Sequence, residues 1–172
     1  GFALFYTGQV SHARGKFSSV LSLRPEEPRA VLGLAYCAFS DKQWNTAVSL
    51  AQRAIDMGGG HFDAHFLIAR AADKGEQLDL ALSHYRISLD LMNQFLESNP
   101  DHASGYYLRG MVYYAQGFHK EALEDIDRAL SCAQPGKIYL AYHEYITWTK
   151  ILGMKGKCLY RLGEVESARR IG

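Results

Sequence analysis

The chain of 172 residues is 48% hydrophobic and 22% charged and has only 4 prolines. This composition excludes an intrinsically disordered chain and predicts a folded body whose core needs neither metal nor disulfide at this length. The formal net charge of +1 excludes a general electrostatic attraction to nucleic acid or anionic lipid, so partners must be recognised by local features.

The cysteine pattern and the lack of long apolar runs indicate which cellular compartment the sequence favours. Cys37, Cys132 and Cys158 are odd in number, far apart and without a Cys-x-x-Cys pair. This pattern argues against a disulfide framework and favours a reducing compartment such as the cytoplasm. No apolar run approaches the roughly 20 residues that span a bilayer, so we expect no membrane insertion. Because the N-terminus lacks an initiator Met and a basic segment, we expect a soluble piece of a longer protein.

Small residues recur along the chain at fixed distances. One series has two steps of 34 residues and then gaps of 41 and 46; it consists of Ala13, Ala47, Ala81, Ala122 and Ala168. Two further series follow the same gaps: Ala35, Ala69, Gly110 and Gly156, and Val20, Ala54, Ser88 and Ala129. A 34-residue unit with small residues in two segments predicts pairs of helices that cross closely.

Turn residues divide each unit into two amphipathic stretches, and helix terminators separate the units. The predicted units are a partial repeat at 1–25, repeats at 28–59, 62–98 and 101–134, and a last repeat at 137–172 that stops within its second helix. Strand-like alternation is missing, and Val and Ile are scarce beside better helix formers. We therefore predict an all-α chain with helices of about 12 to 15 residues.

Two gaps exceed 34 residues. The first adds seven residues, close to two helical turns, so 89–98 is expected to extend the second helix of its repeat without rotating its face. The second adds twelve, and the segment 138–162 predicts one unbroken first helix that projects past its neighbours. Its apolar side chains would fold back or offer a surface to a partner. These side chains are Tyr139, Tyr142, Tyr145, Ile146 and Trp148.

The segment Tyr106–Gly117, followed by Glu121–Leu123 and Arg128–Leu130, resembles a tetratricopeptide repeat. Similar copies contain Leu34, Ala35, Trp44, Ala47, Ala51 and Ala54, then Ile68, Ala69, Gly75, Ala81, Tyr85 and Ser88. The resemblance implies a right-handed superhelical solenoid of antiparallel helix pairs, whose first helices line a concave groove that usually binds a peptide or helix of another protein. Arg109 and Lys155 depart from the family pattern, which usually has a large apolar residue at these positions.

Each first helix carries a second stripe beside its packing stripe, at the four-then-three spacing of one helical face. The candidate partner-binding residues on these stripes are Leu32, Tyr36, Phe39, Phe66, Arg70, Tyr107, Met111, Tyr114, Lys157 and Tyr160. Aromatic anchors beside two cations, Arg70 and Lys157, favour a partner segment that is amphipathic and partly acidic. The alternative is that individual aromatics only pack on the next helix.

One specialised groove function is not expected. Family members that clamp the acidic tail of a chaperone resemble this chain overall but place Lys, Asn, Asn, Lys and Arg along this face. Here aromatic residues occupy the corresponding face. We therefore predict no tight binding of such a tail.

Catalytic, metal and cofactor sites find little support. His61 and His65 share a helix face with Asp63 nearby, but two histidines are too few for a structural zinc site. His143 and Glu144 begin like a zinc-protease motif, yet Thr147 stands where the second His is needed. No nucleophile with its base and no phosphate loop is recognisable, and the acidic run Glu121, Glu124, Asp125 and Asp127 indicates a solvated helix face. We predict no enzyme, no metal and no cofactor.

The sequence therefore predicts a non-catalytic protein-interaction module whose concave groove receives a segment of another protein. One alternative is a scaffold subunit that docks through the helix 138–162. Another is a helical repeat that reads RNA, which the net charge and the lack of a basic stripe oppose. Self-association through truncated ends is a further alternative, because a cut solenoid leaves apolar helix faces uncovered.

Overall fold

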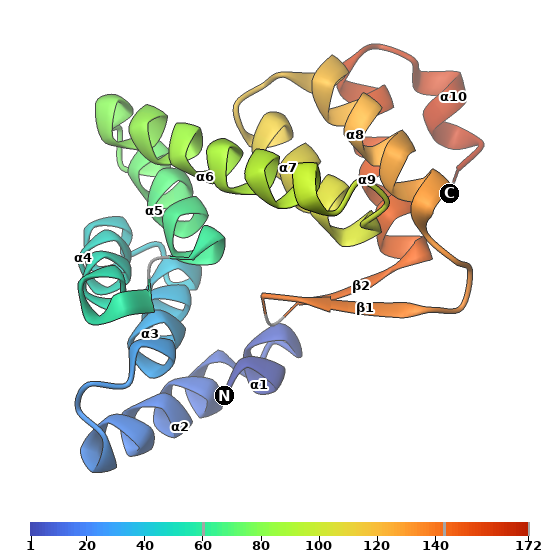
Figure 1. Ribbon diagram of the computed structural model, residues 1–172. Coiled ribbons are helices and arrows are strands. Elements are labelled where there is room, and N and C mark those ends of the chain that lie inside the picture. The colour runs from blue at the N-terminus through green and yellow to red at the C-terminus, as the bar shows by residue number, and fades with distance from the viewer. Residues whose placement is uncertain (60, 143, 172) are drawn as a thin grey trace. The chain divides into compact units, whose positions relative to one another are not determined.

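The computed structural model describes residues 1–59, 61–142 and 144–171, and the chain divides into two compact units, Gly1–Ser88 and Leu89–Gly172. Both units consist mainly of antiparallel helix pairs (Figure 1). The boundary between the units falls inside a long helix, α6 (Leu78–Ser98), and residues 89–98 extend this helix as the seven-residue insertion predicts. None of the helices in these described ranges is long and apolar enough to cross a membrane.

The first unit begins with a short helix and continues with longer helices that pack in chain order. Its elements are α1 (Phe2–Tyr6), α2 (Val10–Leu23), α3 (Pro28–Ser40), α4 (Trp44–Ala54), the π-helical turn η1 (Ile55–Gly59), α5 (Phe62–Lys74) and the first part of α6. α2 packs on α3, α3 on α4, and α4 on α5. Pro28 begins α3, where its missing N–H leaves no helical hydrogen bond unmade. The core between α3, α4 and α5 contains Val31, Leu32, Ala35, Ala51, Leu67 and Ile68.

The second unit contains the remainder of α6 and two further helix pairs with a hairpin between them. Its elements are α7 (Ala103–Ala115), α8 (His119–Cys132), β1 (Ile138–Ala141), β2 (Glu144–Thr147), α9 (Trp148–Arg161) and α10 (Val165–Arg169). α7 packs on α8, α8 on α9, and α9 on α10. His102 caps the start of α7, since its ring Nδ1 accepts a hydrogen bond of 3.3 Å from the N–H of Gly105.

The predicted helix over 138–162 is wrong in its first ten residues. Ile138–Ala141 and Glu144–Thr147 pair as antiparallel strands, with Ile138 opposite Thr147 and Ala141 opposite Glu144. The segment is rich in β-branched and aromatic residues, which favour strands, and Tyr142 adopts the positive φ of 47° that a tight hairpin turn needs. The helix then begins at Trp148, because the side chain of Thr147 accepts a hydrogen bond of 3.2 Å from the N–H of Lys150.

The small residues of the three series lie mostly where helices cross. Ala13, Ala47, Ala69 and Ala129 are fully buried. Val20, by contrast, is 39% exposed. Gly156 and Ala168 are half-buried. These three residues belong to the first and last helix pairs of the described chain, where a neighbouring pair packs on one side only.

The two departures from the repeat pattern are explained by ion pairs with α8. Arg109 binds the carboxylate of Asp125 through Nε at 2.8 Å and through a terminal nitrogen at 2.7 Å, and it also donates to Asn93. Lys155 pairs with Asp127 at 2.7 Å. Asp125 is only 5% exposed, so the prediction of a solvated acidic face is wrong at this residue.

Candidate partner-binding surfaces

In the first unit the predicted site residues come from α3 and α5. Leu32 and Phe66 are buried, at 4% and 7% exposure, and contribute packing rather than accessible surface. Tyr36, Phe39 and Arg70 are half-buried. The accessible part of the predicted stripe in this unit is therefore limited to these three side chains.

Arg70 of α5 is held by aromatic rings. Its guanidinium lies 4.7 Å from the ring centroid of Phe39 and 5.6 Å from that of Phe66. The ring of Phe39 also meets Trp44 of α4 edge-on, with centroids 5.2 Å apart. Cation–π contacts of this kind fix the position of the guanidinium over the two rings.

Tyr36 belongs to a second group of rings in the same unit. It meets Phe2 and Phe5 of α1 edge-on, with centroid distances of 6.1 Å and 5.7 Å. The short helix α1 thus contacts α3 through aromatic rings, and Tyr36 supplies the ring on α3.

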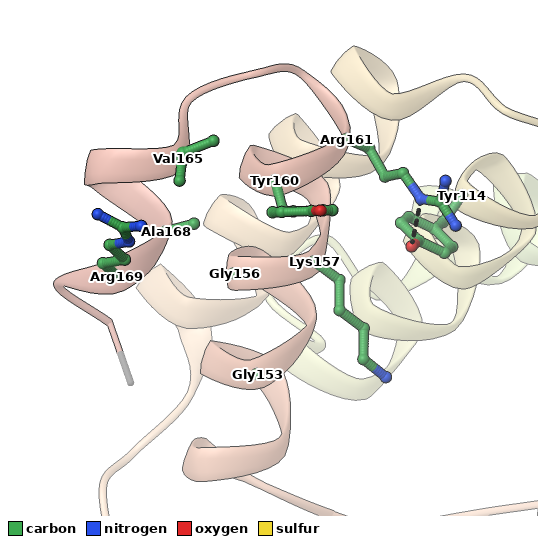
Figure 2. Close-up of a pocket in the computed structure, with 9 residues that line it drawn as sticks. All are labelled: Tyr114, Gly153, Gly156, Lys157, Tyr160, Arg161, Val165, Ala168 and Arg169. Carbon is green, nitrogen blue, oxygen red and sulfur yellow. Dashed lines mark hydrogen bonds between the residues drawn. The ribbon is translucent and has the colours of Figure 1, made fainter.

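The second unit has an open pocket of about 740 Å³. It is lined by residues of α9 and α10 and by one residue of α7. The residues that line it are Tyr114, Gly153, Gly156, Lys157, Tyr160, Arg161, Val165, Ala168 and Arg169. Figure 2 shows the α10 residues on one side of Tyr160 and the hydrogen bond between Arg161 and Tyr114 on the other. Tyr160 is 64% exposed, so a large aromatic surface is offered to the pocket.

The pocket is cationic. Lys157, Arg161 and Arg169 contribute ammonium and guanidinium groups, and Arg169 pairs with Glu166 at 3.0 Å. The Nε of Arg161 donates to the hydroxyl of Tyr114 at 3.3 Å, and this hydrogen bond raises the pKa of Arg161 above its ordinary value. A wall of tyrosine, valine, alanine and glycine beside these cations suits a segment that is apolar on one side and acidic on the other.

The structure brings together some of the predicted residues of the second unit and not others. Tyr114, Lys157 and Tyr160 line the pocket as a group. Tyr107 is 4% exposed and is a packing residue, while Met111 is half-buried and lies outside the pocket lining.

Sequence reasoning missed the contributions of Arg161, Val165 and Arg169 to the pocket. Arg161 lies one position beyond the predicted stripe, and the other two lie on α10. The predicted stripe follows one face of the first helix in each pair, so it does not include a site lined by both helices of a pair. The basic character of the last residues, with Arg161, Arg169 and Arg170, was the available signal.

Of the histidine and cysteine residues, His84, Cys37 and Cys158 are buried in packed helices, whereas His12 and His61 are exposed. Across the described parts of the chain, no three His, Cys, Asp or Glu side chains are grouped to hold a metal. His65 faces His84, at 3.1 Å between their Nδ1 atoms, and His143 lies outside the described residues. Burial raises the pKa of the Cys37 thiol, and it raises that of Cys158 to about 11. Both thiols are therefore protonated at neutral pH and are poor nucleophiles.

Comparison with known proteins agrees with the repeat pattern. The tetratricopeptide repeat family model matches residues 3–60, 42–91 and 77–137. None of the curated proteins compared with the chain matches it.

Solved structures share the fold at low sequence identity. TTC0263, a thermophilic TPR protein in Thermus thermophilus, has a TM-score of 0.70 and 16% identity, and the match covers 98% of this chain and 82% of that one. MamA 41-end from Desulfovibrio magneticus RS-1 has a TM-score of 0.54 and 15% identity, covering 98% and 85% of the two chains. MamA AMB-1 has a TM-score of 0.54 and 14% identity, covering 99% and 90%. Three overlapping matches to the family model and the paired helices of both units lead to one conclusion: the chain belongs to the tetratricopeptide repeat family.

Proposed function

We propose that the chain is a non-catalytic protein-interaction module and that the pocket of α9 and α10 binds a helical segment of a partner protein. The observation that carries the proposal is the pocket itself, which combines an exposed tyrosine, an apolar wall and three cations in about 740 Å³. Such a combination of aromatic anchors and charge is typical of surfaces that recognise proteins.

The repeat architecture indicates what kind of segment fits. In the first unit, α5 packs on both helices of the preceding pair, α3 and α4. We infer that the α9–α10 pair is the counterpart of α3–α4, with five residues in α10 where α4 has eleven. Its pocket is lined by both of its helices. We therefore infer that the segment is an amphipathic helix with a small, apolar face toward Ala168 and Val165 and with carboxylates toward Lys157 and Arg161.

The half-buried aromatic surface of the first unit is a second candidate for partner contact. Arg70, whose guanidinium lies near the rings of Phe39 and Phe66, offers a cation next to apolar surface.

Non-catalytic action is supported by the buried, protonated thiols of Cys37 and Cys158. The three cysteines are free, which supports a reducing compartment.

A display selection of peptides against the folded chain tests the proposal. Peptides from a random library of about five helical turns are expected to converge on amphipathic, acidic sequences. Their binding should be lost with Tyr160→Ala and with Lys157→Glu.

Three variants act as comparisons in the same selection. Lys120→Glu makes the same charge change at an exposed residue of α8 that does not line the pocket, and should leave binding intact. Phe39→Ala probes the surface of the first unit, and Leu140→Glu the exposed face of the hairpin. Peptides that depend on Phe39 or Leu140 and not on Tyr160 would overturn the assignment of the pocket.

A further inference from the structure

Two histidines from neighbouring helices meet in the interior of the first unit. The Nδ1 atoms of His65 on α5 and His84 on α6 are 3.1 Å apart, and their ring centroids are 5.1 Å apart. His84 is only 8% exposed and His65 is half-buried. This contact was not anticipated from sequence, which paired His65 with His61.

The contact depends on the protonation state of the two rings. A hydrogen bond between two Nδ1 atoms needs one N–H donor and one lone-pair acceptor, so at least one ring must be neutral. When both rings are protonated, two N–H groups and two positive charges face each other across the same short distance. That arrangement is repulsive, and burial strengthens the repulsion because little water screens it.

The surroundings of the pair favour the neutral rings. Burial lowers the pKa of His65, and Asp63 on the same helix opposes this lowering. Burial also lowers the pKa of His84, and the charge of His65 adds to the effect.

The pair lies at a contact that holds α5 and α6 together. Next to it along both helices, Phe66 of α5 and Tyr85 of α6 place their ring centroids 6.2 Å apart. Both Phe66 and Tyr85 are buried, so separating the histidines would expose apolar surface beside them. Loss of the histidine contact therefore weakens the packing of this helix pair.

We infer that the contact between His65 and His84 is an acid-sensitive link between α5 and α6, which holds the two helices together at neutral pH and opens when both rings are protonated. The inference concerns the helix pair itself and does not depend on the proposed partner site of the second unit. An unfolded histidine titrates near 6.5, and the folded rings bind protons less readily. The stabilisation is therefore complete above about pH 6.5 and decreases as the pH falls through the lowered folded values.

Amide hydrogen exchange of the full chain at pH 7.5 and pH 5.5 tests this, with rates corrected for intrinsic exchange. The opening constant of α5 and the first part of α6 is expected to rise at pH 5.5 by up to about tenfold for each histidine. In His65→Asn/His84→Asn, an amide takes the place of each ring nitrogen and cannot titrate, so this extra opening should disappear. His12→Asn, at an exposed residue of α2, is the matched control and should keep the pH dependence.

NMR titration of the histidine rings in the unmodified chain provides a second measurement that does not depend on the folding of the double variant. Both rings are expected to titrate below 6.5. Titration of both rings at or above that value would overturn the inference. A double variant that folds and keeps the full pH dependence would also overturn it.

Discussion

The turn inside each helix pair places one residue in the left-handed region. Gly8, Lys42, Glu76, Gly117 and Gly163 occupy equivalent positions, with φ between 60° and 84°. Glycine adopts this conformation without steric cost, whereas a residue with a Cβ loses roughly 1–2 kcal/mol there.

The strain at Lys42 predicts a stabilising substitution. Lys42→Gly should raise the free energy of unfolding by about 0.5 to 1 kcal/mol, since relief of the strain exceeds the entropy gained by the unfolded chain. Urea unfolding measures the difference. Gly117→Ala, at the equivalent turn of the second unit, should lower stability by about 1 kcal/mol. A destabilised Lys42→Gly variant would show that the lysine side chain contributes more than its backbone costs.

The ion pair between Arg109 and Asp125 is a second feature with a measurable consequence. Asp125→Ala leaves the half-buried guanidinium without its carboxylate, so we expect a loss of about 3 kcal/mol in unfolding free energy. Asp127→Ala breaks the more exposed pair with Lys155 and should cost less than about 1 kcal/mol. Equal losses in the two variants, measured by thermal unfolding, would contradict this ranking.

At the scale of elements, the helix pairs were predictable from sequence and the hairpin was not. The series of small residues marked the crossings, because only small side chains allow two helices to approach closely, and the buried Ala47 and Ala69 show the result. In 138–147 the run of Tyr, Leu and Ile is compatible with a helix as well as with a strand, so the apolar pattern alone does not distinguish the two. The cap formed by Thr147 was the local signal that separates the hairpin from α9.

The two faces of the hairpin predict opposite responses to truncation. Ile146 is fully buried, while Leu140 is 67% exposed on the other face. Ile146→Ala should cost about 3 kcal/mol, because it leaves a cavity. Leu140→Ala should change stability by less than about 0.5 kcal/mol. A large loss in the Leu140 variant, measured by urea unfolding, would mean that this exposed face is covered in solution.

At the scale of the whole molecule, the candidate site was predictable only in part. The stripe pattern found Tyr114, Lys157 and Tyr160, because the spacing of one helical face can be counted along the chain. It missed Val165 and Arg169 on α10, because the register between two helices of a pair is set by packing and not by local sequence. It missed Arg161 because this residue lies on α9 one position beyond the predicted stripe. It also included Leu32, Phe66 and Tyr107, whose burial depends on how neighbouring helices pack.

We propose that the pocket of α9 and α10 recognises an acidic amphipathic helix. Calorimetric titration of one selected peptide into the chain, into Lys157→Glu and into Lys120→Glu, at low and high salt, tests it most directly. We expect binding that weakens with salt, a loss of about tenfold or more in the affinity of Lys157→Glu, and no loss in that of Lys120→Glu. Equal affinity for all three chains, unchanged by salt, would contradict it.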